Sequence, residues 1–180
     1  MKKTLFFLVF VITLFSCKNE ENNKEIKEEE NKIEVDDTFK VSLNVLVKKD
    51  DDFQIYYTEN KGETFTEEKS IWVAVKGNDN LQKIVFEMPK DVLPNLVRFD
   101  FGVNDNQEDI LLSSIEMEYF GKKFIIEKEM LSAYFRPLEL TQIDFNTGIL
   151  SPTIQDGKRV ESVLHPHETV LEPEIQKLIQ

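Results

Sequence analysis

Five polar and aromatic side chains alternate with apolar residues in three short segments of the chain. They are Gln54 and Tyr56, then Trp72, then Arg98 and Asp100. In an extended segment successive side chains point to opposite faces, so packing the apolar residues inside leaves these five outside. Aromatic rings stack on sugar rings while Arg and Asp bond hydroxyl groups, which predicts a glycan-binding face. In the alternative interpretation, Tyr56 and Trp72 lie under a loop and Arg98 and Asp100 are merely solvated.

Two loops are rich in the hard oxygen ligands that calcium prefers. One is Asp50-Asp51-Asp52, and the other runs over residues 104–109 as NDNQED. Neither has the spacing of an EF-hand loop, which needs a glycine at its sixth place. Asp and Asn are also the usual residues of β-turns. A structural calcium ion is therefore one interpretation and ordinary turn chemistry the other, and we predict no cofactor.

His165 and His167 are the only histidines, and Glu168 follows them directly. Two alternate residues in an extended segment could bind zinc from one side, but a third ligand would have to be an acid from elsewhere. The alternative is a polar surface turn. We predict no metal site from this motif.

Recognisable catalytic motifs are missing from the sequence. It has no G-x-S-x-G, no H-E-x-x-H and no phosphate-binding loop. Paired carboxylates for glycoside hydrolysis need a defined pair, and nothing singles one out among 34 acidic residues. We therefore predict a protein that is not an enzyme. A hydrolase would instead require a deep cleft with convergent acids.

The elements that would position these side chains have the period of two that is typical of β-strands. Seven such segments are rich in β-branched and aromatic residues: 39–47, 53–58, 71–75, 82–88, 96–101, 110–119 and 123–127. Gly, Asn and Asp lie between them, as in turns. The pattern predicts an all-β protein, a single antiparallel β-sandwich of jelly-roll type over residues 38–168. Residues 169–180 form a tail, in which a short helix is expected to start near Pro173.

The first 17 residues have the layout of a secretory signal peptide. Lys2 and Lys3 are followed by an uncharged run over residues 4–15, and Cys17 is the only cysteine of the chain. Leu14, Ser16 and Cys17 resemble the lipobox of bacterial lipoproteins. This resemblance implies that residues 1–16 are removed and that Cys17 carries palmitate or a related acyl chain. The alternative is an ordinary cleaved signal with an incidental cysteine.

Residues 18–37 are strongly acidic, with nine acids against four lysines. Such a segment cannot bury enough apolar surface to fold, so residues 17–37 are expected to be a lipidated cysteine and a disordered tether. The order Cys17-Lys18-Asn19-Glu20-Glu21 resembles the lipoprotein export signal of Bacteroidota. This resemblance implies attachment to the outer membrane and display on the cell surface. The alternative is an acidic tether that serves solubility alone.

Removal of the signal would leave 20 basic and 34 acidic residues, a net charge of −14, since the signal holds two of the 22 basic residues. This sign argues against nucleic acid, whose phosphates need Lys and Arg. It also argues against electrostatic docking on anionic lipid.

The stretch from Asp52 to Gly102 resembles jelly-roll β-sandwich modules of Bacteroidota lipoproteins, which are similar to carbohydrate-binding domains. The resemblance is carried by residues 53–57 (FQIYY), Phe65, 68–70 (EKS), 81–86 (LQKIVF) and 96–102 (LVRFDFG). It implies that the ligand is a glycan or a cell-surface polymer. The alternative function is a protein-interaction or scaffolding subunit of a cell-envelope assembly, with an envelope protein as its partner.

Overall fold

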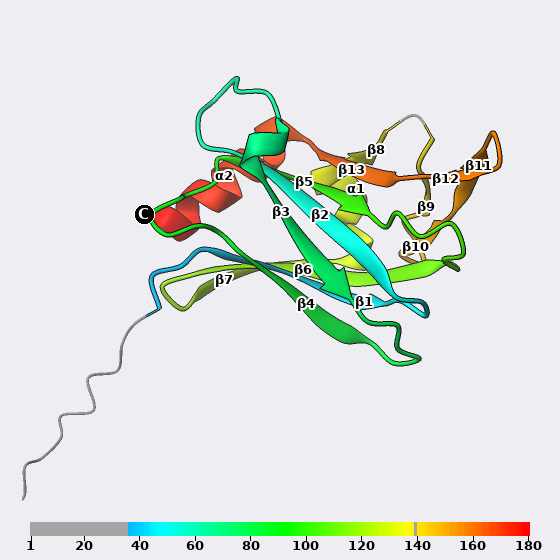
Figure 1. The fold of residues 1–180 in the computed structure, drawn as a ribbon. Helices are drawn as coiled ribbons and strands as arrows, with labels where there is room; N and C mark the ends of the chain where they lie inside the picture. Colours follow the sequence, from blue (N-terminus) through cyan, green and yellow to red (C-terminus); the bar gives the residue numbers. More distant parts are fainter. Residues whose placement is uncertain (1–35, 139) are drawn as a thin grey trace, which may run out of the picture. The chain divides into compact units, whose positions relative to one another are not determined.

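The computed structural model describes residues 36–138 and 140–180 (Figure 1). Seven strands form its first half: β1 (Lys40–Leu46), β2 (Asp51–Thr58), β3 (Ser70–Val75), β4 (Gln82–Glu87), β5 (Leu96–Phe101), β6 (Ile110–Tyr119) and β7 (Lys122–Glu127). All seven coincide closely with the segments predicted from the period of two.

Shorter strands follow in the second half of the described chain. They are β8 (Phe135–Pro137), β9 (Gln142–Asp144), β10 (Ile149–Ser151), β11 (Thr153–Gln155), β12 (Lys158–Val160) and β13 (Ser162–Pro166). Four short helical elements complete the described part: η1 (Glu67–Lys69), η2 (Lys128–Met130), α1 (Leu131–Tyr134) and α2 (Glu168–Ile179). The three-residue strands are too short for a period of two to be read from sequence.

The strands form two antiparallel sheets and a separate hairpin. One sheet has the order β4-β1-β6-β10-β9, with β7 beside β6, and the other has the order β3-β2-β5-β13-β8. Among the described strands, β11 and β12 pair only with each other. Every pairing is antiparallel, so the prediction of an all-β sandwich is confirmed.

The core lies between the two sheets and is built by the alternating apolar residues. Val41, Leu43 and Val45 of β1 are buried against the aromatic residues of the opposite sheet. There Phe53 and Phe101 meet edge to face with ring centroids 5.4 Å apart. Because one face of each strand is buried in this way, the other face of the five-stranded sheet must carry the polar side chains.

Helix α2 differs from the prediction for the C-terminal tail, because it begins at Glu168 and not near Pro173. Leu171, Ile175 and Leu178 lie on one side of the helix and are buried in the core. The proline suggested a helix start, but the helix begins five residues before it, and Leu171 already lies on the buried side. The tail is therefore part of the packed domain.

Cys17 and the predicted signal and tether up to residue 35 lie outside the described residues. Within residues 36–138 and 140–180, every helix is too short or too polar to cross a bilayer.

Candidate functional site

The five residues of the predicted glycan-binding face do share the outer face of the five-stranded sheet. Gln54 of β2 lies opposite Trp72 of β3 and opposite Asp100 of β5. Tyr56 lies opposite Arg98 in the same ladder. Cross-strand partners point to the same side of a sheet, so the strand pairing gathers the five as the alternation predicted.

A short helix covers part of this face. The Gln54 amide donates hydrogen bonds to Glu67 Oε2 at 3.0 Å and to Ser70 Oγ at 2.9 Å, and the Tyr56 hydroxyl donates to Glu67 Oε1. Gln54 and Tyr56 are consequently buried under η1. Trp72 stays outside this cover and is 50% exposed. The loop alternative therefore describes Tyr56 and is wrong for Trp72.

The hydrogen bonds to Glu67 shift two pKa values in opposite directions. Burial and the Glu67 carboxylate raise the pKa of the Tyr56 hydroxyl. The bonds from Tyr56 and then Gln54 lower the pKa of Glu67, because they stabilise its ionised form. Glu67 is thus a fixed anion that holds η1 against the sheet.

Arg98 and Asp100 form a two-bonded ion pair on the neighbouring strand. Arg98 Nε donates to Asp100 Oδ1 at 2.8 Å, and Arg98 Nη2 donates to Oδ2. The guanidinium carbon also lies 4.4 Å from the centre of the Tyr56 ring. Asp100 is buried, so the alternative that it is merely solvated is wrong. Burial raises its pKa, and the Arg98 guanidinium opposes that shift.

Next to this pair the surface is hollowed into a cavity of about 430 Å³. We call it the arginine recess. Its lining includes Arg98 and Arg136, together with Phe65, Leu138, His165 and Glu168. The chain has three arginines and two histidines, so most of its arginines and half of its histidines meet at one cavity.

The groups of the recess are held in place by contacts with one another. Arg136 Nη2 lies 3.4 Å from His165 Nδ1, which is also 3.1 Å from the Pro166 carbonyl oxygen. The Phe65 ring meets the imidazole edge to face at 5.4 Å. Burial, together with the nearby guanidinium groups, lowers the pKa of His165, which favours the neutral imidazole at pH 7. A neutral imidazole can both donate and accept a hydrogen bond.

The charges at the recess are unequally compensated. Glu63 of its rim accepts hydrogen bonds from Lys69 and from the amides of Glu59 and Asn60. These bonds, that of Lys69 first, lower the pKa of Glu63 to about 2. By contrast, no carboxylate of residues 36–138 or 140–180 forms an ion pair with Arg136. Its guanidinium can therefore offer its donors to a ligand.

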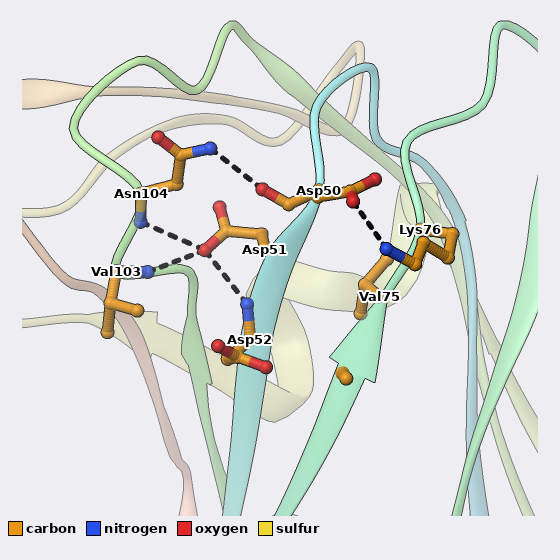
Figure 2. Close-up of a pocket in the computed structure, with 8 residues that line it drawn as sticks. Asp50, Asp51, Asp52, Val75, Lys76, Val103 and Asn104 are labelled. Carbon is orange, nitrogen blue, oxygen red and sulfur yellow. Dashed lines mark hydrogen bonds and ion pairs between the residues drawn. The ribbon is translucent and has the colours of Figure 1, made fainter.

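The two acidic loops proposed for calcium do come together, and Figure 2 shows the cavity between them. Asp51 Oδ1 accepts the amides of Asp52, Val103 and Asn104 at 2.7–3.0 Å. Asp51 Oδ2 accepts Gln107 Nε2 at 2.8 Å and lies 3.2 Å from Arg159 Nη1. Protein donors therefore occupy both oxygens of the carboxylate at the centre of the cluster.

The described residues contain no group of three or more His, Cys, Asp or Glu arranged to hold a metal ion. His165 points into the arginine recess, while the carbonyl of His167 accepts the first helical amides of α2, from Val170 and Leu171. The two histidines thus have separate structural surroundings.

Alternation placed Gln54, Tyr56, Arg98 and Asp100 on one face of the sheet, as the strand pairing does. Sequence reasoning missed Glu67, which bonds Gln54 and Tyr56, and Arg136, which lines the arginine recess with Arg98. Both come from segments that carry no period of two. The scarcity of arginine in the chain was the one signal that could have drawn attention to Arg136.

Comparison with known proteins leaves the site to be interpreted from its geometry, because no family model, curated protein or solved structure matches this chain.

Proposed function

We propose that this chain is a lipid-anchored protein of the bacterial outer membrane whose β-sandwich binds a glycan without catalysis. The anchor is Cys17, and the acidic segment after it carries the sandwich to the cell surface. The lipid anchor and the display at the cell surface are both inferred from the resemblance to lipoprotein signals. Three acyl chains, as in bacterial lipoproteins, would hold the domain at the membrane without a spanning helix.

The observation that carries the ligand proposal is the arginine recess. Arg136 and Arg98 present planar donor groups, and His165 and Phe65 present ring surfaces at the same cavity. Sugars are bound by this combination, in which rings stack on the pyranose and polar groups bond the hydroxyls. A cavity of about 430 Å³ lies within the range of roughly 300–1,000 Å³ that is usual for small-molecule sites.

The chemistry of the recess favours a sugar that carries a carboxylate. The guanidinium fork matches a carboxylate with two parallel hydrogen bonds, a geometry that lysine does not offer. Arg98 is held by Asp100, so Arg136 is the group that would bind the anion, while Glu168 can accept from a hydroxyl. A uronic-acid polymer is the ligand class that fits.

An array of neutral and acidic oligosaccharides tests this function. We expect retention on the uronic-acid members, and we expect Arg136→Gln to abolish it, since glutamine keeps the polarity but removes the charge and the fork. Lys177→Gln, on the exposed side of α2, is the matched control. If the array retains wild type and Arg136→Gln equally, the arginine recess is not the binding site.

The anchor is tested separately by metabolic labelling with palmitate. The wild-type chain should be labelled and should fractionate with the outer membrane, whereas Cys17→Ser should lose both properties. A Cys17→Ser variant that fractionates unchanged would overturn the lipoprotein proposal.

A second candidate function is supported by the edge of the five-stranded sheet. Trp72 is half exposed on β3, an edge strand that pairs on one side only among the described strands. An exposed aromatic on an unpaired edge suits a protein partner. A photo-crosslinking amino acid at position 72 should then give a defined protein adduct in intact cells, while the glycan array stays blank.

A further inference from the structure

The turn between β6 and β7 exposes an aromatic side chain on an unusual backbone. Phe120 has φ 49° and Gly121 has φ 76°, and Phe120 is 49% exposed. A two-residue hairpin turn with both φ values positive is of type I′, which favours Asn-Gly. A phenylalanine in the left-handed region is strained, because its Cβ approaches the following carbonyl. The turn thus holds a large apolar group in water where a small polar residue would be more stable.

This tip, residues Tyr119–Lys122, is firmly attached to the domain. The Phe120 ring meets the Tyr119 ring edge to face at 4.6 Å, and the Tyr119 ring stacks on Phe39 at 5.9 Å. Phe39 is buried in the core. The exposed ring is therefore the outer member of a row of aromatic rings that runs into the core.

The described chain begins beside the same tip. The described chain begins at Asp36, four residues before β1, and Lys40 of β1 lies opposite Glu118 of β6. Figure 1 shows the blue start of the described chain next to the turn between β6 and β7. The described chain therefore enters β1 beside the tip that carries Phe120.

We propose that this tip places Phe120 in the interfacial layer of the bilayer that holds Cys17, an inference that rests on the lipid anchor proposed above. Asp36 is nineteen positions after Cys17 (36 minus 17), which keeps this end of the domain within about 65 Å of the anchor. Aromatic rings prefer the membrane–water interface, and an exposed lysine such as Lys122 can stay at the headgroup level.

The contact is apolar and does not depend on anionic lipid. Two acidic side chains near the tip are paired with lysines, Glu118 with Lys123 at 3.1 Å and Glu87 with Lys40 at 3.5 Å. Since the chain as a whole is acidic, an anionic surface would repel it, and a zwitterionic bilayer would serve better.

The test uses the full lipidated chain in phosphatidylcholine vesicles, with or without brominated acyl chains. Trp72→Phe removes the only tryptophan, and Phe120→Trp then places a single fluorophore at the tip. The matched control is Ile154→Trp in the same background. Ile154 is 57% exposed on β11, at the other end of the domain in Figure 1.

We expect brominated lipid to remove most of the fluorescence of the Phe120→Trp chain and to leave that of the Ile154→Trp chain nearly unchanged. Chains that float with the vesicles but show equal quenching at both positions overturn the contact while the anchor stands. Chains that do not float overturn both. As a second measurement on the wild-type chain, the amides of residues 119–122 should exchange more slowly on vesicles than in the Cys17→Ser protein, and equal rates would contradict the proposal.

Discussion

Arg159 and Asp51 form an ion pair, with 3.2 Å between Nη1 and Oδ2, and their side chains are only 1% and 0% exposed. The pair joins β12 of the β11–β12 hairpin to the start of β2, next to the loop that follows β5. Arg159 also donates to the carbonyl oxygens of Asn104 at 3.2 Å and Phe101 at 3.4 Å. The guanidinium thus lies among oxygen atoms from both acidic loops, as a bound cation would.

Asp51→Asn should therefore strongly destabilise the domain. In either orientation, the NH2 group of the new asparagine would face donors, either the backbone amides that bond Asp51 Oδ1 or the Gln107 and Arg159 groups that bond Oδ2. Arg159 would also be left as a buried charge without its partner, at a cost of about 3–5 kcal/mol. Urea denaturation of the variant and of Asp52→Asn, a neighbour with an exposed side chain, measures the effect. A loss no greater than that of Asp52→Asn would contradict the role of the pair.

Gly102→Ala should be destabilising for a related reason. Gly102 has φ 73°, and a Cβ there would collide with the Asp51 carboxylate and come within 3.0 Å of Arg159 Nη1. Gly157→Ala is the matched control, because Gly157 has φ 77° but open space around it. We expect about 1–2 kcal/mol for the control from backbone strain alone and a clearly larger loss for Gly102→Ala. If both variants lose the same thermal stability, the structure accommodates the new Cβ at position 102 without a collision with Asp51.

Phe120→Asn should stabilise the domain, by about 1 kcal/mol, since asparagine tolerates the left-handed region that this turn requires. Gly121→Ala should act in the opposite direction, because φ at that position is 76°. Denaturant midpoints of both variants give the comparison. If Phe120→Asn is less stable than wild type, the ring serves folding through Tyr119 and its exposure needs no membrane to explain it.

Glu63 should make stability depend on pH at the acid end. Lys69 and two amides lower the folded-state pKa of Glu63 to about 2, from an ordinary value of 4.5. The contribution of the Glu63 carboxylate to the free energy of unfolding is therefore fully present above pH 4.5 and is lost as the pH falls toward 2. Glu63→Gln should flatten the dependence of the unfolding free energy on pH in this window, and Lys69→Met should flatten it similarly. Unchanged slopes in both variants would contradict the assignment.

The long strands could be predicted from sequence because burial of one face leaves a period of two, as with Val41, Leu43 and Val45 in β1. The strands from β8 to β12 could not, because three residues hold too little of that period. At the site, alternation placed Gln54 and Asp100 on one face. Their burial depends on η1 and on the ion pair with Arg98, which are tertiary contacts that the local pattern does not encode.

The most direct measurement on the proposed function is a calorimetric titration of a uronic-acid oligosaccharide into the sandwich domain of the wild-type chain and of Arg136→Gln. We predict a 1:1 binding isotherm for the wild type and a loss of about tenfold or more in affinity for the variant, as expected when a charged hydrogen-bonded pair is removed. An equal affinity in both proteins, or binding of neutral and acidic oligosaccharides without distinction, would contradict the assignment of the arginine recess.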